Sequence, residues 1–294
     1  MTPLAKASVH SRPIHISTLP GLVLNGRWRS ESLRALGSHA FIWITRGQGR
    51  ATIGATTRGI SANNLLVIPA GKVHAISLSN SMQGYACYLP DDLPVPVPER
   101  PCLIKAKSIF EQGQLTGYFE QISTEHLALK IGASYAMESY MTLISVWVER
   151  NQTINDWPDP RVSNRSAHVV GRFLTRLERE YRVMQSVSAY AKMLNVTPTH
   201  LSRVCSAEVG KPALELIQDR LILAARCDLA DTDQKIREIS ERLGFTSAAY
   251  FTRFFGQHCG LSPSQYRAQQ AGGHPNRLQI LPVKTARYPH SQRP

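Results

Sequence analysis

Two short segments near the C-terminus repeat one pattern, and this repetition constrains the fold more than any other feature of the 294-residue chain. In each segment a short amphipathic helix leads through a tight turn into a second helix. The segments run from Val187 to Arg203 and from Ile236 to Arg253. Because helix pairs of this kind place their second helix in the major groove of DNA, the pattern predicts two DNA-reading units.

Matching residues supply the turn and the start of the second helix in both segments. Asn195 and Gly244 stand where the chain needs a left-handed conformation, which these residue types tolerate. Thr197 and Ser247 follow them, and each can cap the second helix with its side-chain oxygen. The local sequence therefore predicts the boundaries of both recognition helices.

The distribution of charge favours a nucleic-acid partner. The chain carries a net charge of +13, and residues 164–294 contain 19 Lys and Arg against 10 Asp and Glu. Residues 1–163 contain 15 basic and 11 acidic residues, so most of the basic excess accompanies the repeated helices. The alternative interpretation is a cationic surface that only faces solvent.

The first part of the chain has the pattern of an antiparallel β-domain. From about residue 14 to residue 90, short β-branched and aromatic runs alternate with Gly and Pro breaks, which predicts a barrel or jelly roll that encloses a cavity. We expect a small-molecule effector to contact aromatic and histidine side chains in this domain, with Trp28, His39, Trp43, His74 and Tyr85 as candidates. Their alternative role is ordinary packing or a structural hydrogen bond.

The histidines of this region do not form a metal-binding pattern. No His-x-His occurs in the sequence, and no Glu lies a few residues beyond His39 to complete a ligand set. We therefore expect neither a metal ion nor a cofactor, and no constellation of residues predicts catalysis. An enzyme is accordingly not expected.

Residues 109–149 predict a helical segment with apolar side chains on two faces. Leu115, Phe119 and Ile122 share one face, and a second set comprises Tyr140, Leu143, Ile144 and Trp147. Such a segment either packs on its own β-domain or forms a dimer interface, and we favour the dimer. Residues 151–165 lack periodicity and predict a linker.

The helical repeats resemble the AraC/XylS family of bacterial transcription regulators over residues 167–270. The resemblance is carried by Leu201-Ser-Arg203, Gly210-Lys-Pro212, Arg220-Leu-x-x-Ala224, Ile239-Ser-Glu-Arg-Leu-Gly-Phe245, Tyr250-Phe-Thr-Arg-Phe-Phe255 and Gly260-Leu-Ser-Pro-Ser-Gln-Tyr-Arg267. The N-terminal segment is similar to the cupin-like effector domain of that family through Gly47-Gln-Gly49 and Ile68-Pro-Ala-Gly-Lys-Val-His74, which is a weaker likeness.

The resemblance implies which side chains face DNA. In the first recognition helix these are Thr199, Ser202 and Arg203, and in the second they are Ala248, Ala249, Thr252 and Arg253. An arginine can donate two hydrogen bonds to a guanine, whereas alanine can only touch a thymine methyl group. Each arginine has two alternative roles, a phosphate contact or an ion pair within the domain.

Two segments depart from the family pattern directly after these arginines. The aromatic-plus-lysine ending is replaced by Val204-Cys205-Ser206 in the first unit and by Phe254-Phe255-Gly256 in the second. We expect weaker anchoring to the DNA backbone at both places, and a smaller, looser core in the first unit.

These observations predict an α+β multidomain chain. Its expected parts are a cupin-like β-barrel that senses an effector (residues 1–105), a helical dimerisation segment (106–150), a linker (151–165), an all-α DNA-binding domain with two helix-turn-helix motifs (166–270) and a flexible tail (271–294). No signal peptide or apolar run of about 20 residues is present, and the five cysteines lack a CxxC spacing, so we expect a cytoplasmic protein with reduced thiols and no membrane contact.

The resemblance implies a sequence-specific regulator, and we favour an activator. The expected partners are double-stranded promoter DNA, RNA polymerase, a small-molecule effector and a second copy of the chain. Two alternatives stay open: an architectural DNA-binding protein without an effector, and a cupin-type metalloenzyme fused to a DNA-binding domain.

Overall fold

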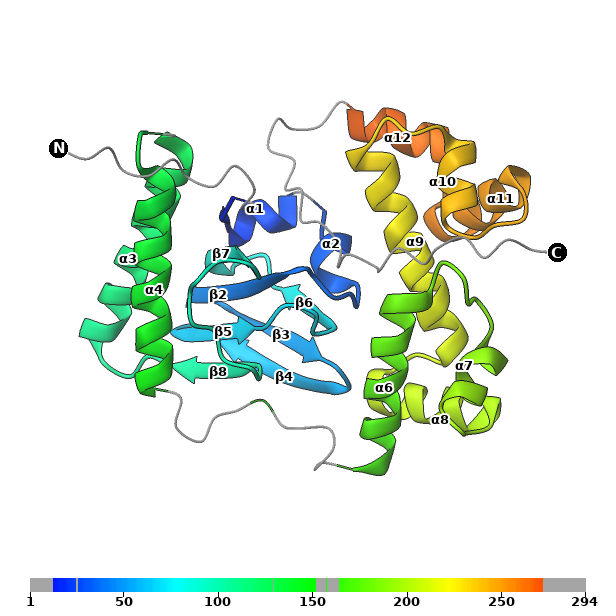
Figure 1. The fold of residues 1–294 in the computed structure, drawn as a ribbon, viewed down its shortest axis with the longest axis horizontal. Helices are drawn as coiled ribbons and strands as arrows, with labels where there is room; N and C mark the ends of the chain where they lie inside the picture. Colours follow the sequence, from blue (N-terminus) through cyan, green and yellow to red (C-terminus); the bar gives the residue numbers. More distant parts are fainter. Residues whose placement is uncertain (1–12, 25, 129, 152–156, 158–163, 272–294) are drawn as a thin grey trace.

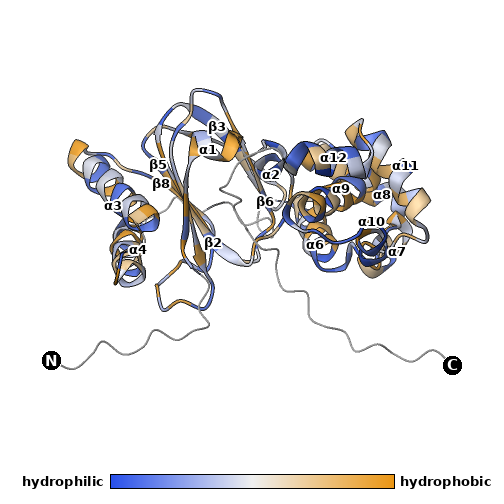
Figure 2. Cartoon of the chain, turned by 90° about the horizontal axis from the view of Figure 1, so that it is seen from above, coloured by the Kyte–Doolittle hydropathy of each residue, from blue (hydrophilic) through white to orange (hydrophobic). Residues whose placement is uncertain are grey.

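The computed structural model describes residues 13–24, 26–128, 130–151, 157 and 164–271. Figure 1 shows three neighbouring parts: a pair of long helices, a central group of strands, and a separate bundle of helices. The view from above in Figure 2 places them in the same succession. The predicted linker and tail lie almost entirely outside the described residues.

The N-terminal strands form two separate antiparallel sheets. The first has the order β1-β7-β2-β5-β8 and the second the order β4-β3-β6. The strands are β1 (His15–Thr18), β2 (Ser38–Arg46), β3 (Gln48–Ile53), β4 (Thr56–Ser61), β5 (Asn64–Ile68), β6 (His74–Leu78), β7 (Gln83–Pro90) and β8 (Cys102–Lys105). The antiparallel β-fold is thus present, but the predicted closed barrel is not, because the described strands pair within two sheets that do not join into one.

The central strands are buried on both faces of the large sheet. Along β2, Phe41 and Trp43 point into one buried cluster, whereas Ile42 and Ile44 point into another. Strands with both faces covered need continuous apolar runs instead of the alternation of a half-exposed strand. The residues of β2 therefore divide between two cores.

Helices α3 (Ile109–Ala128) and α4 (Ala133–Asn151) cover one of these faces. The predicted first face of the segment, Leu115, Phe119 and Ile122, is fully buried in the same cluster as Phe41 and Trp43. This face therefore packs on the chain's own sheet, which was the alternative to the expected dimer interface. On the opposite side of the sheet lie the short helices α1 (Leu19–Leu24) and α2 (Trp28–Glu31).

The C-terminal part is entirely helical. Its elements are α6 (Arg165–Glu180), α7 (Val187–Met193), α8 (Pro198–Val209), α9 (Ala213–Asp231), α10 (Ile236–Arg242), α11 (Ala248–Cys259) and α12 (Pro263–Ala271). The predicted helix-turn-helix units correspond to α7–α8 and α10–α11, and α9 connects them. One continuous buried cluster runs through this domain.

The predicted turn and cap residues are confirmed in both units. Asn195 and Gly244 have positive φ angles of 55° and 80°. The side chain of Thr197 accepts a hydrogen bond from the backbone N–H of His200, and that of Ser247 accepts one from Tyr250. Both recognition helices therefore begin at the capping residue that their sequence specifies.

Candidate DNA-binding surface and ligand cavities

The first helix-turn-helix unit keeps its predicted DNA-facing side chains at the surface of α8. Thr199 and Arg203 are exposed and Ser202 is partly exposed, while Leu201 between them is fully buried. The Nη2 atom of Arg203 lies 3.2 Å from Nδ1 of His200 on the preceding turn. This contact leaves the guanidinium on the solvent side of the helix, where a DNA group can reach it.

The second unit presents a smaller surface on α11. Ala249, Thr252 and Arg253 are exposed and Ala248 is partly exposed, while Phe251 fixes the helix in the core. The Thr252 hydroxyl donates to the carbonyl of Ala248 at 2.8 Å. Among the described residues, no carboxylate pairs with Arg253 or with its counterpart in α8, so neither arginine forms the ion pair considered as an alternative.

Buried charges attach α6 to the helix that joins the two units. Arg220 of α9 donates from Nε and Nη2 to the Glu178 carboxylate at 2.7 and 2.8 Å, and its guanidinium lies 3.8 Å from the Tyr181 ring centre. Burial alone would lower the pKa of Arg220, but the Glu178 carboxylate raises it overall, so the guanidinium stays charged. A bidentate pair excluded from water fixes both partners in position, because separating them would leave a buried charge unpaired.

A second ion pair connects the other unit to the same helix. Arg242, at the end of α10, pairs with Asp228 near the end of α9. Both recognition helices are thus connected to α9, the first through α6 and the second through α10. Their mutual orientation therefore depends on α9. Two readers that bind the same face of a duplex need a fixed mutual orientation of this kind.

The five side chains expected to contact an effector are not gathered in one place. Trp43 and Tyr85 face the helical layer: Trp43 Nε1 donates to Thr116 Oγ1 at 3.0 Å, and Tyr85 stacks on Phe119 with ring centres 6.1 Å apart. These two aromatic residues belong to the packing between sheet and helices.

The remaining three candidates lie on the other side of the large sheet or at its end. His39 accepts a hydrogen bond at Nδ1 from the backbone N–H of Ala70 at 3.1 Å. Trp28 belongs to α2 and lines a cleft beside the helical domain, whereas His74 lines a cavity of the β-domain. The candidates thus divide between structural positions and two different cavities.

The cavity that His74 lines is small and has a partly polar lining. Its polar lining includes Arg34, His74 and Tyr88 among apolar side chains, and its volume is about 30 Å³, which is room for about one water molecule. Burial lowers the pKa of His74 to about 4, so the imidazole is neutral near pH 7. Its Nδ1 atom lies 2.8 Å from the carbonyl oxygen of Lys72.

Arg34 was not predicted as a cavity residue, whereas Tyr88 is a strand aromatic of the kind expected to line a cavity. Arg34 lies near the cavity because its backbone exchanges two hydrogen bonds with that of His74, at 3.1 and 3.0 Å. This bridge is isolated from the named strands, so no periodic pattern in the sequence marks it. For Tyr88, the signal is its place in β7 beside Cys87 and Leu89, which point to the opposite face.

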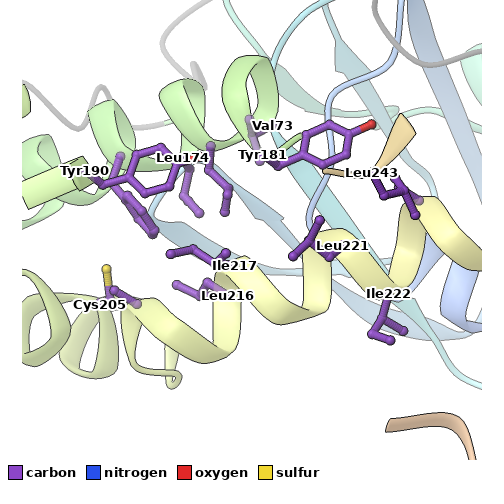
Figure 3. Packing of buried hydrophobic residues seen from close by; sticks show 14 of the residues in the cluster. Val73, Leu174, Tyr181, Tyr190, Cys205, Leu216, Ile217, Leu221, Ile222 and Leu243 are labelled. Atoms are coloured by element: carbon purple, nitrogen blue, oxygen red, sulfur yellow. The ribbon is translucent and has the colours of Figure 1, made fainter. Parts of the chain in front are cut away.

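The contacts between the two domains include a salt bridge and a buried apolar side chain. Arg29 of α2 donates from Nη1 and Nη2 to the Asp231 carboxylate at 2.9 and 2.7 Å. Burial would lower the pKa of Arg29, but its hydrogen bonds to Asp231 raise it overall. Val73, in the loop before β6, is buried in the cluster that contains Leu174 and Tyr181 of the helical domain (Figure 3).

Neither contact was predicted from the sequence. The partners of the salt bridge are 202 residues apart, and the loop of Val73 was singled out only for its likeness to a family turn. In the structure, three consecutive residues of that loop have different environments. Lys72 is exposed, Val73 enters the core of the helical domain, and His74 lines the cavity of the β-domain.

The described part of the chain contains neither a group of metal-ligating side chains nor a helix suited to cross a membrane. No group of three or more His, Cys, Asp or Glu side chains lies close enough together to hold a metal ion. No helix there combines the length and the apolar character that a membrane crossing requires.

Comparisons with known proteins place the similarity in the helical domain. A family model described as a helix-turn-helix domain matches residues 190–269. The HTH-type transcriptional activator AarP of Providencia stuartii is 30% identical over 118 residues, which cover 40% of this chain and 86% of AarP. The uncharacterized HTH-type transcriptional regulator YfiF of Bacillus subtilis is 38% identical over 78 residues, which cover 26% of this chain and 24% of YfiF.

Solved structures are also similar to part of this chain. The C-terminal domain of AraT, a response regulator from Geobacillus stearothermophilus, is 30% identical and covers 36% of this chain and 88% of its own, with a TM-score of 0.34. The chain thus spans about a quarter of YfiF but most of AarP.

Proposed function

The chain belongs to the AraC/XylS family of DNA-binding transcription regulators, and from this premise we propose that it is a sequence-specific activator that responds to a small-molecule effector. In this role it binds promoter DNA in the bacterial cytoplasm through both helix-turn-helix units and contacts RNA polymerase there. The proposed role is regulatory and involves no catalysis.

One observation carries the DNA-binding part of the proposal. Two recognition helices expose an arginine each. A buried ion pair holds α6, on which α8 packs, to the single helix α9, and a partly buried ion pair holds α10 of the second unit to the same helix. Readers with a fixed separation can enter successive major-groove segments on one face of DNA, which lie about 34 Å apart. We therefore expect a binding site of two short boxes whose centres are about one helical turn apart.

The spacing of the boxes provides the test. We propose to select bound sequences from a random DNA pool with the full chain and then to insert five base pairs between the boxes of the best sequence. Because about ten base pairs make one turn, this insertion moves one box to the opposite face, and binding should fall to that of a single box. An architectural binder would instead enrich no common sequence, and its binding would not depend on the insertion.

The effector part of the proposal depends on the loop of residues 69–74. This loop joins the cavity, through His74, to the core of the helical domain, through Val73. A ligand that displaces His74 would also displace Val73, and this physical connection is what coupling between two sites requires. Because the cavity has only about 30 Å³ of space, the effector must be very small or must enlarge it on binding.

A metabolite screen on the full chain tests this coupling. A ligand of the native state raises the melting temperature, and each such compound is then assayed for its effect on DNA affinity. Val73→Ala is the matched variant, since it leaves the cavity lining intact. We expect this variant to bind the compound but to show no change in DNA affinity when the compound is bound. If the compound changes the DNA affinity of the variant as much as that of the wild type, the loop does not couple the cavity to the helical domain.

We also propose that the chain forms a homodimer through the outer surface of α3 and α4. Three apolar side chains are exposed in this part of the chain: Leu127 near the end of α3, Ile131 in the turn before α4 and Leu143 within α4, with 71%, 108% and 45% of their surface accessible, although the inner faces of both helices are buried. A contact with another protein would cover such exposed apolar residues. Sedimentation of the full chain and of Leu127→Glu/Leu143→Glu distinguishes the cases: the wild type should be dimeric and the variant monomeric with an unchanged melting temperature at low concentration.

A further inference from the structure

A cationic cleft lies between the two domains. It shares no lining residue with the proposed effector cavity. It has a volume of about 690 Å³, which is in the range of small-molecule sites. One wall comes from the β-domain, including Lys72, Val73 and Arg100, and the other comes from α6. The cleft is open to solvent, so a ligand can enter without a change in either domain.

The α6 wall carries three arginines on one helical face. Arg172, Arg176 and Arg179 are spaced by four and three residues, which places them in a row along the helix with about 6 and 5 Å of rise between neighbours. The opposite face of α6, with Val170, is buried against the rest of the helical domain. The row therefore faces the β-domain and points away from the side of α6 on which α8 packs.

The positive charges of the cleft have little compensation. Five Lys and Arg side chains line it, and none of the described lining residues is acidic. Arg176 pairs with Glu180 at 3.1 Å, but within the described chain Arg172 and Arg179 have no carboxylate partner, and neither have the two cations of the other wall. Like charges on facing walls repel each other, and an anion bound between them would remove this repulsion.

A buried tryptophan forms part of the β-domain wall. Trp157 lines the cleft, only 4% of its surface is exposed, and its indole N–H has no hydrogen-bond partner among the described residues. Its backbone N–H donates to the carbonyl of Pro101 at 2.9 Å, which fixes it to the β-domain wall. The indole nitrogen is shielded from solvent and does not open into the cleft, so the ring serves as a fixed, apolar part of this wall.

From these observations we propose that the cleft binds a small organic anion with at least two carboxylate or phosphate groups. Two groups are needed because each wall has its own unpaired cations, and a single anionic group cannot neutralise both. Arginine donors suit these groups, since the guanidinium forms paired hydrogen bonds with carboxylate and phosphate oxygens. The ligand would connect Lys72 and Arg100 of one domain to α6 of the other and so hold the domains in this arrangement. The site is separate from the cavity of His74, and its occupancy does not depend on the proposed DNA binding.

The binding test uses the full chain without DNA. The probes are phthalate, terephthalate and inorganic phosphate, with benzoate as the singly charged control and sodium chloride at matched ionic strength. We expect at least one dianion to raise the melting temperature by a few degrees, as a ligand of the native state does, and benzoate to have a much smaller effect. If no dianion exceeds the salt control, the proposal is wrong.

Paired variants locate the site. Arg172→Ala/Arg179→Ala removes the cations of one wall and Lys72→Ala/Arg100→Ala those of the other, and each should weaken dianion binding measured by calorimetry about tenfold or more. Arg50→Ala/Arg165→Ala is the matched control, because it also removes two cations, one from each domain, and both lie outside the lining. Equal losses in all three double variants would show that only net charge matters and would overturn the site.

A DNA measurement separates this proposal from a role in holding duplex phosphates. The same variants are assayed for DNA affinity without any probe present. We expect the cleft variants and the control to bind DNA alike, because the cleft is on the β-domain side of α6. If the cleft variants alone lose DNA affinity and no dianion binds the wild type, the arginines serve DNA and the proposal fails, while the proposed regulatory function stands.

Discussion

The two helix-turn-helix units share a backbone plan but fill their cores from different places. In the second unit the recognition helix α11 supplies aromatic residues itself: Phe251 and Phe255 are fully buried, and Phe255 also packs on Tyr266 of α12 with ring centres 5.4 Å apart. In the first unit the position that matches Phe255 is Cys205, which is equally buried. Here the aromatic volume comes from Phe173 of α6 and Tyr190 of α7, which form an edge-to-face pair.

This difference indicates how each unit is supported. The first recognition helix depends on α6, whose other face lines the cationic cleft, so its position is sensitive to the contact between the domains. The second depends on the aromatic residues of its own recognition helix and on Tyr266 of α12. Four comparisons between matched residues test this distinction.

The largest effect is expected for the matched core positions. Phe255→Ala should cost about 3–5 kcal/mol of unfolding free energy, because a large buried ring leaves a cavity. Cys205→Ala should cost only about 1 kcal/mol, since one buried atom is removed. Denaturant unfolding of the full chain measures both; equal costs would show that the first core depends on Cys205 as much as the second depends on its phenylalanine.

The two turns should also respond differently. A Cβ atom on Gly244 would lie 2.0 Å from the carbonyl oxygen of Arg182, at a φ angle of 80°. Gly244→Ala should therefore cost about 2 kcal/mol or more, whereas Asn195→Ala should cost about 1 kcal/mol, since it adds no clash and loses only a residue that tolerates the left-handed conformation. Thermal melting of both variants provides the comparison, and a milder effect at Gly244 would mean that the segment at Arg182 can move away.

The paired arginines test whether the units read DNA independently. Arg203→Ala should relax base preference in one box and Arg253→Ala in the other, each by about 1–3 kcal/mol of discrimination. Sequence selection from a random pool with each variant measures this. A uniform loss of affinity with an unchanged selected sequence would identify the arginines as phosphate contacts.

The helix caps should show the smallest and most similar effects. Thr197 and Ser247 accept a backbone hydrogen bond at 3.2 and 3.1 Å, so their replacement by alanine should cost about 1 kcal/mol in each unit. Melting temperatures of the two variants should agree closely. A clear difference would show that the cap stabilises one unit through contacts other than this hydrogen bond.

The β-domain was predicted less completely than the helical repeats. Its antiparallel strands were expected, but closure into a barrel depends on which strands pair, and the runs of residues alone do not specify this. In the same way, Trp43 and Tyr85 had the residue types of a ligand pocket. They lie in the packing against α3 because strand register assigns alternate residues to opposite faces.

The features that could be predicted from the sequence depend on short-range signals. A cap, a left-handed turn and the spacing of apolar residues act within a few positions, so the two helix-turn-helix units and their boundaries could be recognised without a structure. Tertiary structure alone decided which face of the large sheet each strand residue occupies and where α3 and α4 bury their apolar sides. It also brought Arg29 to Asp231 and Val73 into the helical core, because contacts between residues far apart in the chain depend on the packing of whole elements.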